Sequence, residues 1–253
     1  MSKHRAPTHV TAHITLTIAG KPLAGDYTVP VGIAPARELV PIARRLIGTL
    51  VDRGVESVEA KGERVSCRKG CGACCRQLVP VSPVEARDIR RLIESLPQPR
   101  RTEIYRRIDA ACRLLEGAGL LSALREPGAL SGKLNAIGLE YFGLGIACPF
   151  LEEESCSIHP DRPVACREYL VTSPAEECAK PRAETVRKVP VAGNVTRALM
   201  ELDAEPTWVP LVLAADWAER HPEKPETRTG PQMLKRFFEG FVRQRLDVPE
   251  PMA

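Results

Sequence analysis

Apolar and polar residues alternate along the first thirty positions in a way that predicts a β-hairpin. Turn-forming residues occupy 20–26, and residues 27–31 can return as a partner strand. A period of two is typical of a strand with one buried face. The apolar positions of the first strand, expected over residues 8–19, are Val10, Ala12, Ile14, Leu16 and Ile18.

The period changes to that of a helix between residues 37 and 53. Gly54 follows, and we expect it to end this helix because glycine is common just past a helix C-terminus. The residues that fit one apolar face are Leu39, Ile42, Ala43, Leu46, Ile47, Leu50 and Val51.

A second helix has a strong start signal at Ser82-Pro83-Val84-Glu85, with a serine N-cap, proline in the first turn and glutamate at the third position. It should run to about Leu96, before Pro97 and Pro99. Further helices are predicted near 102–116, 194–203, 209–220 and 231–245, with short helices and turns over 119–145.

These patterns predict a mainly α, α+β fold, with an irregular cysteine-rich core surrounded by helices and an N-terminal β-hairpin. Three segments are expected: hairpin and helix in 1–60, a cysteine-cluster metal-binding domain in 61–182, and a C-terminal helical extension in 183–253 that packs on the core. A chain of 253 residues is long enough to bury a proper core.

Composition restricts the function classes. The net charge of +4 is small for this length and gives no argument for nucleic acid or a membrane as a partner. The longest apolar stretch, Trp208 to Ala215, is far shorter than a membrane span, and the N-terminus has no apolar run of signal-peptide length. We therefore expect a cytoplasmic protein, in which clustered cysteines more often bind metal than form disulfides.

Eight of the nine cysteines fall into two groups, a spacing typical of a metal or iron–sulfur site. Thiolate ligands favour zinc, copper(I) or iron–sulfur clusters over calcium or magnesium. Cys74 and Cys75 are adjacent, and neighbouring side chains diverge, so the pair should bind two different metal atoms, or one cysteine binds and the other points into the core. The pair favours a polynuclear site or two neighbouring sites over one tetrahedron. The candidate metal ligands are Cys67, Cys71, Cys74 and Cys75 in the first group, and Cys148, Cys156, Cys166 and Cys178 in the second.

Charge differs between the two groups. Residues 61–76 are mainly basic and residues 148–178 mainly acidic, so the segments should attract each other. One hypothesis is an electrostatic clasp around a metal. The other, which we favour, is ordinary solvated surface charge.

The cysteine pattern resembles the YkgJ or CxxCxxCC family of cysteine-cluster proteins, a family associated with zinc or iron chelation. The resemblance covers about residues 65–180, with two departures: three residues fill the first gap, and His159 stands where such proteins often have Tyr. It implies eight metal-associated cysteines. Some relatives are linked to flagellin lysine N-methylation with an iron–sulfur cluster. The matching motifs are the four cysteines at 67–75, Cys148-Pro149-Phe150-Leu151, Cys156-Ser157-Ile158-His159, Arg162-Pro163, Cys166-Arg167 and Cys178.

Other candidates have simpler interpretations. Cys112 falls on an apolar helical stripe and should face the core. His159 is more often a turn residue than a nitrogen ligand in such a position, and Arg162 and Arg167 suit a helix start and a salt bridge, although Arg167 could also donate to a metal-bound sulfur. His4, His9, His13 and His221 are expected at the surface, and Phe237, Phe238 and Phe241 in the core.

Three functions remain open. The first is a metal-binding protein with a largely structural site, since closed all-thiolate sites leave no position for substrate. The second is an iron–sulfur-dependent redox or protein-modifying enzyme. A methyltransferase that uses S-adenosylmethionine would usually show a glycine-rich loop after a strand, for which Gly143-Leu144-Gly145 is a weak candidate. The third, ranked last, is an interaction module for a protein or nucleic acid, because no basic and aromatic residues interleave near 61–76.

Overall fold

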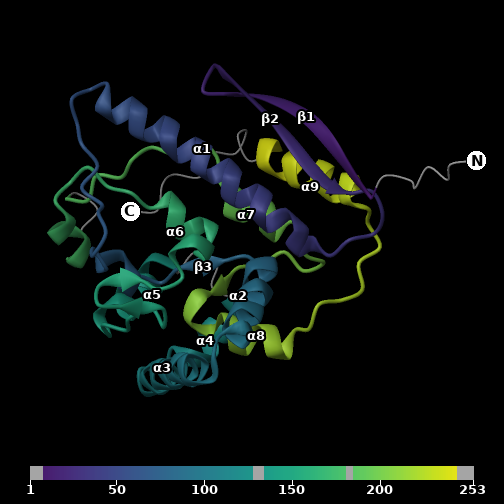
Figure 1. Ribbon diagram of the computed structural model, residues 1–253. Coiled ribbons are helices and arrows are strands. Elements are labelled where there is room, and N and C mark those ends of the chain that lie inside the picture. The colour runs from purple at the N-terminus through teal and green to yellow at the C-terminus, as the bar shows by residue number, and fades with distance from the viewer. Residues whose placement is uncertain (1–7, 128–133, 181–184, 244–253) are drawn as a thin grey trace, which may run out of the picture.

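The computed structural model describes residues 8–127, 134–180 and 185–243 (Figure 1). The predicted hairpin is confirmed: β1 (His9–Ile18) pairs antiparallel with β2 (Lys21–Pro30). The second strand starts six residues earlier than expected, because the turn is only Ala19-Gly20. Both residues have positive φ, 49° and 77°, which suits a tight two-residue hairpin turn.

A short 3-10 turn, η1 (Ala36–Leu39), leads into α1 (Val40–Glu59). The helix is present as predicted, but the prediction that Gly54 ends it is wrong. A Cβ atom at Gly54 would lie 2.6 Å from the carbonyl oxygen of Pro190. Glycine therefore serves here for close packing of the helix against a later segment, and the helix continues through it.

The second helix, α2 (Pro83–Ser95), has the predicted capping box: Ser82 Oγ accepts from the Glu85 amide, and the Glu85 carboxylate accepts from the Ser82 amide. The next, α3 (Gln98–Gly117), starts four residues earlier than expected because Pro99 fits its first turn. The remaining helices are α4 (Leu121–Arg125), α5 (Leu134–Gly143), α6 (Val164–Glu168), α7 (Val195–Met200), α8 (Ala214–Arg220) and α9 (Gly230–Arg243).

Two very short strand pairs complete the fold. Strand β3 (Pro80–Val81) pairs with β6 (Val209–Pro210), and β4 (Leu151–Glu152) pairs with β5 (Ser155–Cys156). The helix expected over 209–220 therefore begins only at Ala214, after β6 and a 3-10 turn, η6 (Leu211–Leu213). The fold is mainly helical α+β, as predicted.

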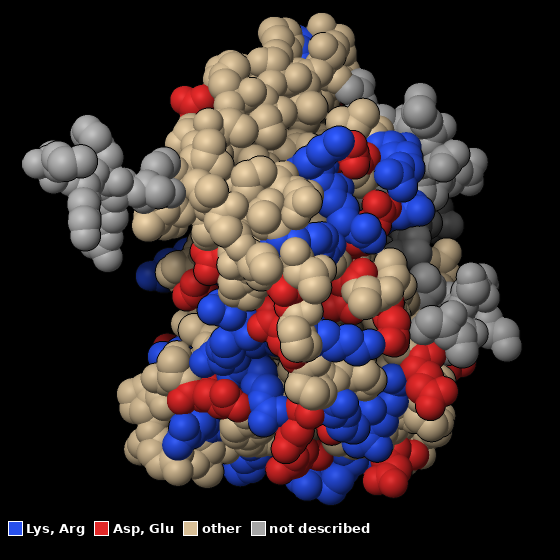
Figure 2. Space-filling model, turned by 90° about the vertical axis from the view of Figure 1, so that its right-hand side faces the viewer, with Lys and Arg blue, Asp and Glu red and all other residues tan. Residues whose placement is uncertain are grey.

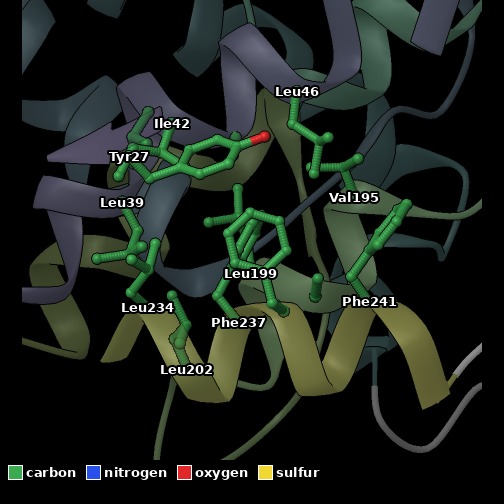
Figure 3. Packing of buried hydrophobic residues seen from close by; sticks show 14 of the residues in the cluster. Tyr27, Leu39, Ile42, Leu46, Val195, Leu199, Leu202, Leu234, Phe237 and Phe241 are labelled. Atoms are coloured by element: carbon green, nitrogen blue, oxygen red, sulfur yellow. The ribbon is translucent and has the colours of Figure 1, made fainter. Parts of the chain in front are cut away.

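The largest hydrophobic cluster lies between the hairpin, α1, α7 and α9 (Figure 3). Phe237 and Phe241 of α9 are fully buried there, as predicted for the phenylalanine stripe. A second cluster joins α2, α3 and α8 with Phe150 and Ile158, and a third lies among α3, α4, α5 and η6. The second cluster matters for the site, because two of its members, Phe150 and Ile158, lie in the cysteine-rich segment.

Charged side chains of both signs are interspersed on the face shown in Figure 2, and the upper part of that face carries few of them. This pattern agrees with the small net charge. Among the described residues, every helix is too short or too polar to cross a membrane.

Candidate metal centre

One cavity of about 660 Å³ brings the two cysteine groups together. It lies where the loop before α2 meets the segment from β4 to the turn η5 (Ala175–Ala179). Cys112 does not line it. All eight predicted ligands do: Cys67, Cys71, Cys74, Cys75, Cys148, Cys156, Cys166 and Cys178.

The first group is carried by tight turns. The amide of Cys71 donates to Arg68 O at 3.1 Å, and the amide of Cys75 donates to Gly72 O at 3.0 Å, so η2 (Ala73–Arg76) presents Cys74 and Cys75 in one turn. Position 72 requires glycine, because the side chain of Glu154 approaches it closely. A Cβ atom there would lie 2.5 Å from Glu154 Oε2.

Two contacts join the groups directly. The amide of Cys148 donates to Cys75 O at 2.7 Å. Arg76 pairs with Glu154 through two hydrogen bonds, at 3.0 and 2.6 Å. The electrostatic clasp thus consists of one bidentate ion pair. The surface-charge interpretation fits the other basic residues of the segment, since they form no ion pair within the described ranges: Lys61, Arg64, Arg68 and Lys69.

The second group is anchored by apolar residues and caps. Phe150, two residues after Cys148, is 1 % exposed. Cys166 lies in α6, whose first amide, that of Val164, donates to the buried Glu85 carboxylate at 2.8 Å. Glu85 therefore caps two helices, α2 and α6, and fixes the cysteine-bearing helix against the core.

Burial raises the pKa of most of these thiols, to about 12 for Cys148. For Cys74 the largest cause is its hydrogen bond with Cys75, followed by burial. A charge on Cys74 would raise the pKa of thiols in both groups, among them Cys67, Cys148, Cys156, Cys166 and Cys178. Cys74 is therefore the thiol through which the two groups interact most widely.

Several donors favour the thiolate forms. Backbone amides lower the pKa of four thiols: Val171 acts on Cys67, Phe150 on Cys148, Ile158 on Cys156, and the amide of Cys74 on its own thiol. These effects are smaller than those of burial.

A side-chain donor acts on the fourth cysteine of the second group. Gln77 Nε2 donates to the hydroxyl of Tyr169 at 3.2 Å, which leaves the hydroxyl proton for the Cys178 sulfur. Nothing in the sequence pattern had singled out Gln77 or Tyr169, because neither is a metal ligand.

The eight thiols share a cavity rather than a formed coordination sphere. Within the described ranges, no three His, Cys, Asp or Glu side chains are arranged to hold a metal ion. The donor set still fits a soft metal, since eight thiols and several N–H donors face one space. His159 also lines the cavity, and the charge of Arg162 lowers its pKa.

The remaining sequence candidates lie elsewhere or act differently than expected. His9 and His13 are exposed as predicted, and His4 lies outside the described residues. His221 is only partly exposed, because its ring stacks on Trp217 at 4.4 Å between centroids. Arg167 forms no salt bridge in the described part and donates instead to the carbonyl oxygens of Pro160 and Arg162.

Comparison with known protein families identifies the same cysteine-rich segment as a metal-chelating domain. Residues 66–188 match the model of the family described as "CxxCxxCC: Putative zinc- or iron-chelating domain". The match contains both cysteine groups and leaves the hairpin, α1 and the helices from α7 onward outside it. No curated protein and no solved structure matches the chain.

Proposed function

We propose that this chain is a metal-binding protein whose eight clustered cysteines hold zinc or an iron–sulfur cluster. The observation that carries the proposal is the single cavity lined by all eight thiols, from segments about seventy residues or more apart in sequence. The match over residues 66–188 supports zinc or iron as the metal.

The number of thiols favours more than one metal atom. A closed zinc site uses four ligands, and the cavity offers twice that number. Cys74 and Cys75 lie in one 3-10 turn, where adjacent side chains diverge, so they suit two different metal atoms. A bound zinc would supply structural order, and a bound iron–sulfur cluster would supply electron transfer as well.

A second candidate is an iron–sulfur-dependent redox or protein-modifying enzyme, distantly like flagellin lysine N-methylases. The exposure of Cys67, together with exposed Arg68 and Lys69 at the same edge of the cavity, favours it. A structural site has all its coordination positions filled by the protein, whereas a catalytic site keeps one open to substrate. This edge gives a substrate a route to the centre.

Anaerobic purification with metal analysis and a visible spectrum tests both candidates. Brown protein with iron and sulfide favours the enzyme. Colourless protein with stoichiometric zinc favours a structural site. Cys74→Ser and Cys148→Ser should each lower the metal per chain, whereas Cys112→Ser, outside the cavity, should not. Protein without metal from anaerobic cells grown with zinc and iron would contradict the proposal.

A further inference from the structure

Arg162 lies in a turn whose backbone is fixed by hydrogen bonds from other elements of the fold. It follows η4 (His159–Asp161) and precedes the helix that carries Cys166. Arg44 donates to the Asp161 carbonyl oxygen at 2.7 Å, and Arg167 donates to Pro160 O at 2.5 Å and to Arg162 O at 3.1 Å. Two arginines thus fix the backbone of this turn.

The side chain of Arg162 itself has no hydrogen-bond or ion-pair partner in the part of the chain that the structure describes. It lines the cysteine cavity, its Nε atom is buried without a hydrogen bond, and it forms no ion pair with the described residues. A buried donor without a partner is costly. Arg44, Arg53, Arg91 and Arg100 also have a buried nitrogen without a partner, but among these described arginines only Arg162 lines the cysteine cavity, which can hold a partner that the protein alone does not supply.

The thiols around Arg162 identify that partner. Arg162 shares the cavity wall with thiols of both groups, among them Cys67, Cys74 and Cys156. Four thiolates around one Zn²⁺ leave a net charge of about −2, and an arginine offers five donors in a fixed fork to such a centre. Hydrogen bonds to ligands commonly raise metal affinity about 10–100-fold.

We propose that Arg162 is a positioning residue of the metal centre, whose guanidinium balances the thiolate charge and donates to ligand sulfurs of both cysteine groups. This inference rests on the proposed function. It assigns to Arg162 a role distinct from the helix start that the sequence suggested.

The test compares Arg162→Gln, Arg162→Lys and Arg53→Gln in protein loaded with zinc. Arg53 on α1 is a matched control, because it is also partly buried with an unpartnered nitrogen but lies away from the cavity. The readouts are the rate of metal transfer to a chelator and the pH at which half of the metal is retained. Far-UV circular dichroism reports whether each variant folds.

Arg162→Gln should release metal about 10–100-fold faster than the unmodified chain and retain it only at higher pH. Arg162→Lys should restore part of the loss, since it keeps the charge but not the fork, and Arg53→Gln should behave like the unmodified chain. If Arg162→Gln fails to fold, the Arg162→Lys variant decides: release at the unmodified rate overturns the inference, and intermediate release supports it.

Three further results would overturn the inference. Arg162→Gln and the unmodified chain could release metal at the same rate, with the proposed function intact. Arg53→Gln could lose metal as fast as Arg162→Gln, which would indicate general loosening. Inorganic phosphate could shift the spectrum of the cobalt-substituted protein only when Arg162 is present, which would make Arg162 an anion site. A chain that binds no metal removes the proposed function and this inference together.

Discussion

Helix α1 and the first cysteine loop lie close in sequence but are stabilised in different ways. The helix buries eight of its residues, most of them in the hydrophobic cluster that it shares with the hairpin, α7 and α9 (Figure 3). In residues 66–80 only Gly72 is buried. Each ordered residue costs about 1–2 kcal/mol of backbone entropy, which apolar burial offsets in α1 and cannot offset in the loop.

The second cysteine segment is intermediate between these two. Phe150 and Ile158 are 1 % and 5 % exposed in the second hydrophobic cluster, so residues 148–158 have an apolar anchor of their own. The loop at 66–80 depends instead on backbone turns, the Arg76–Glu154 pair and whatever the thiols bind. Metal should therefore matter most where apolar burial is least.

Removal of metal is the strongest test of this contrast. Structural zinc contributes on the order of 10–16 kcal/mol of apparent binding free energy in small domains. We expect chelation to abolish hydrogen-exchange protection across 66–78, to reduce it across 146–180, and to leave 37–53 and 231–243 unchanged. Equal protection in both states would mean that the fold is preformed and that the metal serves chemistry rather than stability.

Lowering the pH should have the next largest effect, a loss of metal affinity. Burial raises the pKa of Cys148 to about 12, and that of Cys156 and Cys178 above the ordinary value, so these thiols are protonated at neutral pH. A metal must displace those protons. Its affinity should therefore rise with pH, by about tenfold per pH unit for each thiol that ligates. Cobalt titrations between about pH 6 and 8 measure the slope, and a flat profile would exclude these thiols as ligands.

The elements that apolar periodicity controls could be predicted from sequence, because their burial is local. The hairpin and α9 with Phe237 and Phe241 follow from apolar spacing, and the start of α2 follows from the capping-box residues Ser82 and Glu85. The end of α1 could not be predicted, because the role of Gly54 depends on Pro190, which lies far away in sequence.

The candidate site, too, has residues that could be predicted from the sequence and residues that could not. The cysteines could be found because their density is unusual, and the structure places the eight candidates around one cavity. The places of Arg162 and Tyr169 at the cavity, and the second helix cap that Glu85 provides, could not be predicted, since arginine, tyrosine and glutamate are common surface residues. Their roles depend on burial and on partners from distant segments, such as the Glu85 contact with Val164.

A substitution in the hydrophobic core should lower the free energy of unfolding without changing the metal content per folded chain. Phe237 is fully buried in the first cluster, with its ring 5.2 Å from that of Phe238, so Phe237→Ala should cost about 3–5 kcal/mol of unfolding free energy. Val242→Ala, at a 42 % exposed position on the same helix, should cost under about 0.5 kcal/mol. Denaturant unfolding measures both. Metal per folded chain should stay constant, and its loss in Phe237→Ala would show that the two regions are coupled.

The smallest effect is expected at Cys112, which separates a packing cysteine from a ligand. It lies on α3, partly buried against the second and third hydrophobic clusters, and lines no part of the cysteine cavity. Cys112→Ala removes one sulfur from a partly solvated site, so it should cost about 1 kcal/mol and leave metal per chain unchanged. Cys166→Ala, which removes a similar volume from the cavity wall, should lower the metal content. If both variants lose metal equally, then position in the cavity does not distinguish ligands from core cysteines, and the contrast between the two regions fails at its most local test.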